Sequence, residues 1–313
     1  MADHHHHPGE ADAPYRVEFT PDPELYPFTS RWFDSSVGAV HYLDEGEGRP
    51  LLLMHGNPDW SFLYRKMIPL LTPHFRCIAM DYPGFGLSVH PAGYSYLPRD
   101  HAAIVAELVT HLDLQDAVLV GQDWGGPIGF DVASRMPERF SGLVAGNTMM
   151  WPATPFFIQR TFSQLTGLGF VQRLLVARHL FVRRVMPALV QGAMTEAELR
   201  HYLDVAPTPH SRVGHAIFPK AIVGETEWLA DLEERVAATL ADRPMLRIMG
   251  MKDVPLTTKA YLRKWAEMWP QATTLDLPDA GHFWQEDAPE EAAAAIVAAY
   301  AQHPNSQQPA QRS

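Results

Sequence analysis

The sequence predicts an α/β fold in which a mostly parallel sheet has helices on both faces and an inserted helical cap. Short apolar runs typical of buried strands alternate with amphipathic helical patterns in the first 150 residues. The same alternation resumes at about residue 228, and the stretch between the two parts reads as helices without strands. Strands that alternate with helices form parallel sheets through right-handed crossovers, so we expect both parts to build one sheet.

The predicted elements follow in chain order. Gly38 lies between two strand patterns, at 31–33 and 39–43, and turns them into a hairpin. The first part continues with a strand at 50–55, a helix at 64–71, a strand at 75–80, a helix with the apolar face Ile104, Val105, Leu108, Val109 and Leu112, a strand at 117–120, a helix that stops at Pro137, and a strand at 140–146. The second part gives a strand at 245–249, a helix at 261–269, a strand at 273–277 and a helix at 288–301.

These patterns predict a division into core, cap and tails. We expect residues 30–150 and 228–303 to form the core and 151–227 to form the cap, over the carboxyl ends of the strands where α/β active sites form. A separate helical domain is the alternative, but about 75 residues are few for an independent core. Residues 1–29 read as a tail and lead-in, and 304–313 as a disordered tail.

Composition excludes several classes of partner. The formal net charge of −11 argues against nucleic acid and against an anionic membrane surface, since both select basic faces. No apolar stretch reaches the roughly 18 residues that span a bilayer. Cys77 is the one cysteine, which suits a reducing cytoplasm and leaves no intrachain disulfide. From this cysteine content we expect a cytoplasmic protein. The run His4–His7 has nothing around it to build a metal site, so we expect no metal.

The segment Gly121-Gln122-Asp123-Trp124-Gly125-Gly126 joins a predicted strand to a helix. It has the layout of the nucleophile turn of the α/β-hydrolase fold, with aspartate in place of serine. A carboxylate with a reference pKa of about 3.9 is already anionic at neutral pH, and an ester formed on it must be cleaved by water. The segment therefore predicts a hydrolase with a covalent intermediate. The alternative is an ordinary loop with an aspartate near a helix start.

Two further residues complete the order nucleophile, acid, histidine that this fold keeps. Asp253 follows the predicted strand at 245–249, and His282 lies in a glycine-bent loop after the strand at 273–277. With 16 histidines in the chain, a single one is more often structural, but His282 stands at the expected position. Asp279 is the rival for the acid, and we favour Asp253 because Asp279 is well placed to shape the turn.

The segment His55-Gly56-Asn57-Pro58 follows the first long parallel strand. In this fold that loop supplies one backbone N–H of an oxyanion hole, and the residue after the nucleophile supplies the other, which here are Asn57 and Trp124. Their side chains are also neutral N–H donors, which suit a departing halide. The alternatives are a turn residue for Asn57 and a packing residue for Trp124.

Together these motifs, with Asp81-Tyr82-Pro83-Gly84-Phe85-Gly86, resemble the haloalkane dehalogenases from about residue 31 to 303. The resemblance implies cleavage of a small apolar halogenated substrate to alcohol, halide and proton, without metal or organic cofactor. It implies Asp123 as nucleophile, His282 as base, Asp253 as orienting acid, and Asn57 and Trp124 as halide donors. Some members carry the acid after the strand that follows the nucleophile, where this chain has Gly146-Asn147-Thr148 and no carboxylate. The combination of Asn57 with the late acid Asp253 resembles a subgroup for which homo-oligomers are expected. Whether Trp151 also binds halide stays open.

Three other functions share part of these motifs. Epoxide hydrolases share the aspartate and histidine but usually need two cap tyrosines, and between Trp151 and Trp228 the chain has one, Tyr202. Haloacid dehalogenases of this fold commonly place arginine directly after the nucleophile, where this chain has Trp124. A non-enzymatic receptor or scaffold would not need the complete catalytic set.

Overall fold

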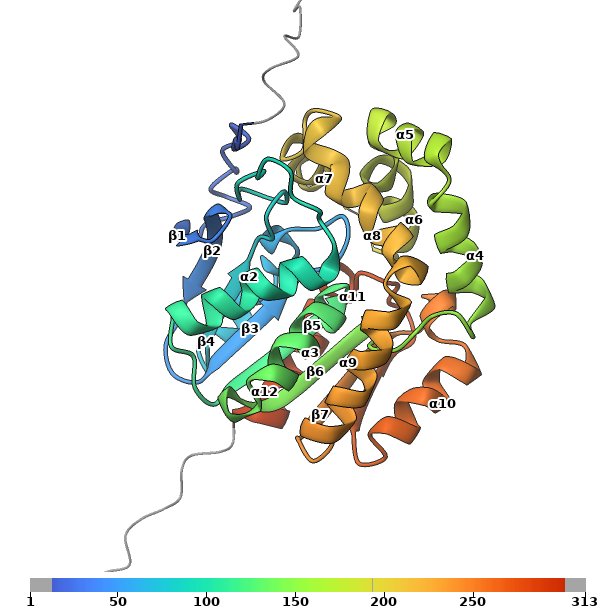
Figure 1. Ribbon diagram of the computed structural model, residues 1–313. Helices are drawn as coiled ribbons and strands as arrows, with labels where there is room; N and C mark the ends of the chain where they lie inside the picture. Colours follow the sequence, from blue (N-terminus) through green and yellow to red (C-terminus); the bar gives the residue numbers. More distant parts are fainter. Residues whose placement is uncertain (1–12, 193, 302–313) are drawn as a thin grey trace, which may run out of the picture.

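The computed structural model describes residues 13–192 and 194–301, which fold around one eight-stranded sheet (Figure 1). The strands lie in the order β1-β2-β4-β3-β5-β6-β7-β8. The β1–β2 and β2–β4 pairs are antiparallel and all the others are parallel, which confirms the predicted fold class. The strands are β1 (Arg31–Ser35), β2 (Gly38–Glu45), β3 (Pro50–Met54), β4 (Arg76–Met80), β5 (Ala117–Asp123), β6 (Phe140–Thr148), β7 (Met245–Gly250) and β8 (Thr273–Leu277).

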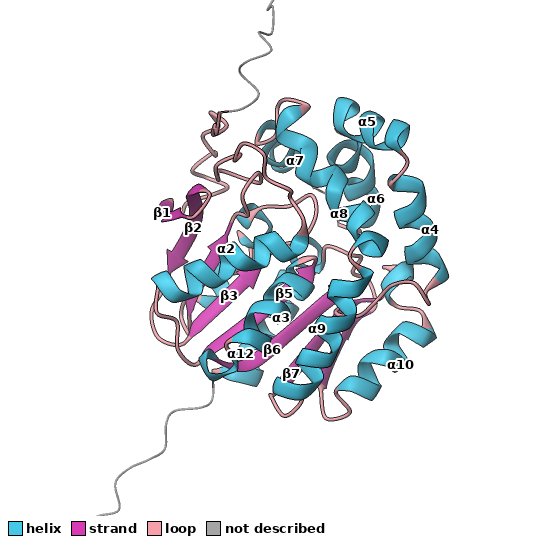
Figure 2. Cartoon of the chain, in the orientation of Figure 1, coloured by secondary structure: helices cyan, strands magenta, loops and turns pink. Residues whose placement is uncertain are grey.

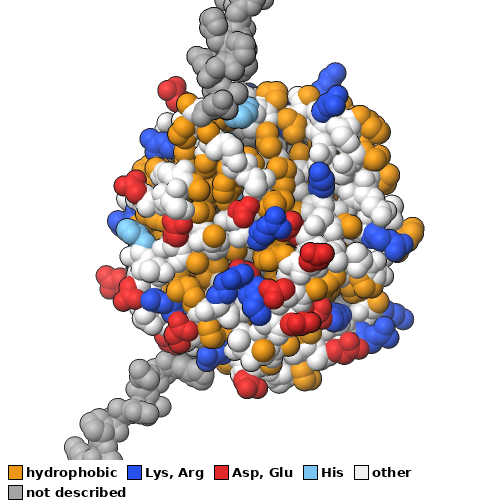
Figure 3. Space-filling view, viewed as in Figure 1, with side chains coloured by type: hydrophobic (Ala, Val, Ile, Leu, Met, Phe, Trp, Pro, Cys, Tyr) orange, Lys and Arg blue, Asp and Glu red, His pale blue; other side chains and the backbone are white. Residues whose placement is uncertain are grey.

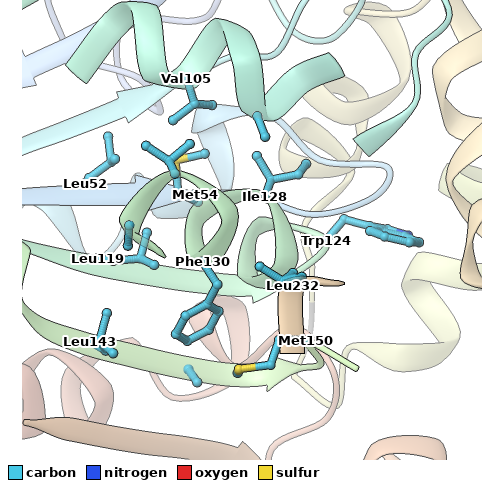
Figure 4. Packing of buried hydrophobic residues seen from close by; sticks show 14 of the residues in the cluster. Leu52, Met54, Val105, Leu119, Trp124, Ile128, Phe130, Leu143, Met150 and Leu232 are labelled. Atoms are coloured by element: carbon cyan, nitrogen blue, oxygen red, sulfur yellow. The ribbon is translucent and has the colours of Figure 1, made fainter. Parts of the chain in front are cut away.

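Both faces of the sheet are covered, because alternate side chains of the central strands point to opposite sides. In β3, Leu52 and Met54 belong to one core, and Leu51 and Leu53 belong to the other. Figure 4 shows the first core, where Ile128 and Val105 lie over Met54. Its helices are α2 (Pro98–His111), α3 (Gly125–Arg135), α9 (Thr226–Thr239) and α10 (Lys259–Met268), and the second core is covered by α1 (Ile68–Leu71) and α12 (Pro289–Tyr300).

The chain between β6 and α9 contains helices joined by loops and no strand in its described residues, and it lies beyond the carboxyl ends of the strands (Figures 1 and 2). Its elements are α4 (Phe157–Thr166), α5 (Gly169–Arg178), the π-helix η4 (Phe181–Val185), α6 (Met186–Leu189), α7 (Glu196–Asp204), the 3-10 helix η5 (His210–Arg212) and α8 (Val213–Gly224). We call α4 to α8 the helical insertion. In the part of the chain that the structure describes, no helix is both long and apolar enough to cross a membrane.

Two features of the fold differ from the sequence prediction. The single helix predicted at 64–71 is wrong: the chain forms the 3-10 helix η2 (Ser61–Tyr64), a turn, and the short α1. Pro69 accounts for the break, because it lacks the N–H that a continuous helix would need and is tolerated only in a first turn. Helix α9 was not predicted, and it begins one residue before the predicted cap boundary at 227. The predicted tail at 304–313 and the run His4–His7 lie outside the described residues.

A buried ion-pair cluster joins the helical insertion to the core. Arg65, after η2, contacts the carboxylates of Glu198 on α7 and of Glu286 on α11 (Trp284–Asp287). Lys66 Nζ lies 2.8 Å from Glu286 Oε2, and the Tyr202 hydroxyl donates to Glu286 Oε1 at 2.6 Å. Since both carboxylates are buried, the guanidinium is needed to offset the cost of removing them from water.

Arg65→Met should therefore destabilise the protein by about 3–5 kcal/mol, because it leaves two buried carboxylates without their main cation. The change is measured as the free energy of unfolding in urea. The matched control is Arg263→Met, since the exposed pair of Arg263 with Glu267 at 3.8 Å contributes less than about 0.5 kcal/mol. Equal losses in the two variants would contradict the anchoring role of the cluster.

Candidate active site

The turn from β5 into α3 holds Asp123 in a strained conformation. Asp123 has φ +50°, a left-handed backbone that non-glycine residues seldom adopt. The turn is tight: a Cβ at Gly121 would lie 2.8 Å from the Gly125 carbonyl oxygen, and one at Gly125 would lie 2.1 Å from the Met54 carbonyl oxygen. Glycine at these two positions lets the turn close against β3. Strain of this kind is typical of a functional position, and here it raises the Asp123 carboxylate above the edge of the sheet.

Asp123, Asp253 and His282 come together from three loops at the carboxyl edge. The His282 Nδ1 atom lies 2.7 Å from Asp253 Oδ2, and its Nε2 atom lies 3.5 Å from Asp123 Oδ2. The imidazole is thus held between two carboxylates. Strand order explains the meeting, because β5, β6, β7 and β8 are successive neighbours and all end at the same edge.

The two carboxylates decide the protonation of His282. Burial by itself lowers the pKa of this imidazole, but the charges of Asp253 and Asp123 outweigh burial and hold the pKa well above its ordinary value. The two carboxylates therefore favour the imidazolium form of the ring. Removing one of the two negative charges would lower the pKa again and allow the ring to accept a proton.

Asn147 is a functional residue that sequence reasoning missed. Its Nδ2 group donates to Asp253 Oδ2 at 2.9 Å and to the Gly250 carbonyl at 3.1 Å, and its Oδ1 accepts from the Gly250 N–H at 2.7 Å. The amide thus holds the Asp253 oxygen that contacts His282 Nδ1. The available signal was an asparagine at the end of a strand, a residue type that tolerates the left-handed φ of +38° found here.

The backbone N–H of Asn57 donates to Asp123 Oδ1 at 2.9 Å, which places it where an oxyanion donor is expected. Its side-chain Nδ2 group donates to the carbonyl of His215 on α8 at 3.2 Å. That carbonyl is free because Pro219, four residues later inside α8, has no N–H to bond it. One N–H of the Asn57 amide is thereby anchored, and the second remains available to a ligand.

Trp124 caps the start of α3, so its backbone N–H belongs to a first turn whose donors have no partner inside the helix. Its side chain is buried and contacts Phe218, with ring centroids 5.6 Å apart. In Figure 4 the indole points away from the other labelled core side chains. Trp151 is also buried, but it packs against Tyr261 and Trp265 and does not line the cavity described next.

All five predicted site residues line one cavity of about 260 Å³. The core supplies Asn57, Asp123, Trp124, Asp253 and His282. The helical insertion supplies uncharged walls, among them Phe162, Phe181, Val185, Pro219 and Ile222. The rival acid Asp279 lies elsewhere: its side chain is 94% exposed and pairs with Lys252 at 3.2 Å. The described residues contain no cluster of three or more side chains that could hold a metal ion.

Comparison with known proteins places the chain among hydrolases. Residues 49–289 match the α/β hydrolase fold family. The chain is 46% identical to haloalkane dehalogenase 2 of Mycobacterium tuberculosis strain H37Rv, over 90% of this chain and 98% of the relative. It is 29% identical to a cis-3-alkyl-4-alkyloxetan-2-one decarboxylase of Shewanella oneidensis, over 85% and 86%. A solved loop variant of a haloalkane dehalogenase from Bradyrhizobium elkanii superimposes with a TM-score of 0.78 at 26% identity, covering 87% of this chain and 95% of that one.

A second missed residue, Asp59, lies beside the site. Its side chain is 1% exposed, and among the described residues neither carboxyl oxygen has a hydrogen-bond partner. Burial raises the pKa of this carboxyl well above its ordinary value, and the Asp123 carboxylate raises it further while His282 opposes. Its surroundings therefore favour the neutral form of the Asp59 carboxyl.

Asp59→Asn should raise the melting temperature, by about 2–6 °C at neutral pH, because an amide has no proton to lose and so removes the cost of keeping a carboxyl neutral in the folded protein. The folded pKa of Asp59 exceeds its unfolded value of about 3.9, so the folded state binds more protons and stability falls as pH rises from about 4 toward the folded pKa. The gain should thus be larger at pH 8 than at pH 5, as followed by thermal melts. Asp279→Asn, at an exposed carboxyl, is the control, and a lower melting temperature in Asp59→Asn at every pH would refute this view of the site.

Proposed function

The chain belongs to the haloalkane dehalogenases of the α/β hydrolase fold, which are hydrolases acting on carbon–halogen bonds, and we propose that Asp123, His282 and Asp253 perform this chemistry. The observation that supports the assignment is the imidazole of His282 between the two carboxylates. The reaction consumes water and a halogenated alkane and yields alcohol, halide and a proton.

The first step is a displacement at carbon. A carboxylate oxygen of Asp123 attacks the carbon that bears the halogen, a carbon–oxygen bond forms, and the halide leaves with the bonding electrons. Asn57 and Trp124 are the proposed donors to the departing anion, and both line the cavity beside Asp123. Neutral N–H donors stabilise the halide without binding it as tightly as a cation would, which allows the product to leave.

The second step is hydrolysis of the ester. His282 removes a proton from a water molecule, and the water oxygen attacks the carbonyl carbon of Asp123. The backbone N–H groups of Asn57 and Trp124 stabilise the resulting oxyanion, as the 2.9 Å contact from Asn57 to Asp123 Oδ1 supports. When the intermediate collapses, the alkoxide takes the remaining proton of the attacking oxygen and departs as alcohol. Over the full cycle Asp123 is restored as a carboxylate and one proton passes through His282 to solvent.

The charge of Asp123 determines at which step His282 can act as a base. While Asp123 is ionised, it helps to hold the pKa of His282 high, and the ring cannot act as a base. Conversion of Asp123 to a neutral ester removes that charge, so the pKa of His282 falls and the ring loses its proton. The base therefore becomes available when there is an ester to cleave.

The structure favours this reaction over the rivals considered from sequence. Epoxide opening needs acids that protonate an alkoxide, and the one tyrosine of the predicted cap, Tyr202, donates its hydroxyl to Glu286 and does not line the cavity. A haloacid would require a cation for its carboxylate, and the helical insertion contributes no charged side chain to the cavity.

We also propose, from the family resemblance, that the protein forms homo-oligomers and acts in the cytoplasm. The buried thiol of Cys77, the one cysteine of the chain, is compatible with a reducing compartment. The molecular mass in solution, measured by light scattering, decides the first of these points.

His282→Phe should stop the reaction after the first step, because the ester forms but no base activates water. With 1-bromobutane we expect one bromide per protein molecule and no further turnover. Intact mass should rise by a butyl group in place of the carboxyl proton, and peptide mapping should locate the adduct on Asp123.

The control is the double variant Asp123→Ala/His282→Phe, which should form no adduct and release no bromide. The unaltered chain should release bromide over many turnovers without accumulating adduct. Continued turnover in His282→Phe, or an adduct on another residue, would disprove the assigned roles. Styrene oxide and a cis-3,4-dialkyl oxetan-2-one are assayed in parallel. Diol from the epoxide without bromide from 1-bromobutane would assign the chain as an epoxide hydrolase. Carbon dioxide from the oxetanone without bromide would assign it as a decarboxylase.

Pro219→Ala should weaken halide binding by about three- to tenfold, the range expected for one hydrogen bond of ~0.5–1.5 kcal/mol. Alanine restores an N–H that bonds the His215 carbonyl within α8, and this bond competes with the Asn57 amide. Bromide affinity is measured by quenching of tryptophan fluorescence.

Lys220→Ala is the matched control, since Lys220 is an exposed neighbour on the same helix and should leave bromide affinity unchanged. In the double variant Asn57→Ala/Pro219→Ala, the proline change should have no further effect, because both act through one amide. Additive losses would show that Pro219 acts on the cavity directly.

A further inference from the structure

Helix α4 has its polarity reversed relative to an ordinary surface helix. Its buried residues are the polar Gln159, Ser163 and Thr166, while Phe157 and Leu165 are 70% and 57% exposed. The buried side chains are satisfied inside the protein: Gln159 Nε2 donates to the Pro255 carbonyl at 2.6 Å, and Ser163 Oγ donates to the Lys220 carbonyl at 3.2 Å. The apolar side of α4 is thus held outward by hydrogen bonds on its inner side.

The apolar surface continues onto α5, where Phe170 is 70% exposed and Leu174 is 48% exposed. We call the exposed side chains of residues 155–188 the outer face. Its exposed large hydrophobic residues are Phe157, Ile158, Phe162, Leu165, Leu168, Phe170 and Leu174. Contiguous exposed apolar surface of this kind marks an interaction site.

The outer face is also cationic. Five exposed arginines lie within it, and residues 155–188 contain no aspartate or glutamate although the whole chain has a net charge of −11. They are Arg160, Arg173, Arg178, Arg183 and Arg184. Among the described residues, none of the five forms an ion pair. In Figure 3 the upper right of the molecule, over α4 and α5, shows hydrophobic and basic side chains and no acidic ones.

Exposed Phe and Leu together with unpaired arginines are typical of segments that lie in the interface of an anionic lipid bilayer. We propose that the outer face binds the surface of an anionic membrane, with Phe157 and Phe170 inserted and the arginines at the headgroups. The net charge of −11 argues against attraction to an anionic membrane, but the acidic residues that produce this charge lie outside residues 155–188.

A second copy of the chain fits the outer face poorly. A two-fold dimer through it would bring its five arginines against those of the partner. A head-to-tail contact would need a complementary apolar surface, but outside the outer face the exposed large hydrophobic residues of the described chain are Trp32, Leu70 and Val254, one on each of three separate elements. Lipid headgroups and acyl chains complement both the charge and the apolar side chains.

The outer face adjoins the cavity, because the two share residues. Ile158 and Phe162 line the cavity and are 39% and 40% exposed. A halogenated alkane that dissolves in the bilayer would then pass from lipid into the cavity without crossing water. Membrane binding goes beyond the proposed function and can be measured without any turnover.

Binding is tested by cosedimentation of the full chain with vesicles of phosphatidylglycerol and phosphatidylcholine, and with vesicles of phosphatidylcholine alone. We expect the protein to sediment with the anionic vesicles and to be released by high salt. Arg173→Ala/Arg178→Ala should weaken binding by about 25-fold, at about fivefold for each cation. Phe157→Ser/Phe170→Ser should also weaken binding, and both variants should retain bromide release because these side chains lie outside the cavity.

Arg31→Ala/Arg263→Ala, at exposed arginines elsewhere, is the matched control and should bind vesicles like the unaltered chain. Equal binding to neutral and anionic vesicles, or unchanged binding in the outer-face variants, would overturn the proposal. A further pair of results would also overturn it: the unaltered chain fails to bind anionic vesicles, and Phe157→Ser/Phe170→Ser dissociates an oligomer in sedimentation velocity. A second copy of the chain would then be the occupant of the outer face.

Discussion

The contact on which the site depends is a buried imidazole between two carboxylates, with His282 bonded to Asp253 at 2.7 Å and facing Asp123 at 3.5 Å. Two negative charges and one positive charge at this spacing stabilise one another in a region where water cannot. The arrangement also makes the state of the base depend on the state of the nucleophile. If Asp253 alone faced the imidazole, this dependence would be lost, because alkylation of Asp123 would not change the charge that holds the histidine proton.

The architecture supplies this contact through strand order and one amide. Because β5, β7 and β8 end at the same edge of the sheet, the three loops need little length to bring their side chains together. β6 lies between β5 and β7, and its last residues place Asn147 where it bonds both Asp253 and the backbone of Gly250. The left-handed residues Asp123 and Asn147 stand at the ends of adjacent strands, so the strain is concentrated where side chains must leave the sheet at unusual angles.

Sequence patterns could predict the strands, the core helices α2, α3, α10 and α12, and the five residues that line the cavity, because each of those features is local. A strand followed by a glycine-rich turn, or an acid directly after a strand, is visible in a few neighbouring residues. Asn147, Asp59 and Pro219 could not be assigned roles in this way, because their roles depend on other elements. Asn147 bonds Asp253, the charges of Asp123 and His282 act on Asp59, and Pro219 leaves the His215 carbonyl free for Asn57. The helix predicted at 64–71 failed for a local reason, since the apolar spacing was weighed without the missing N–H of Pro69.

The two parts of the protein divide the work of recognition from that of chemistry. Every ionisable side chain that lines the cavity comes from the core, whereas the helical insertion contributes uncharged side chains such as Phe181 and Ile222. A substrate bound there meets a wall of low polarity on one side and, on the other, a floor with more negative than positive charge. An anionic substrate would be repelled by that floor, and a strongly polar one would lose its hydration without new partners. The cavity is therefore suited to neutral, apolar molecules, and in the proposed mechanism the carbon–halogen bond is the group in them that Asp123 attacks without prior protonation.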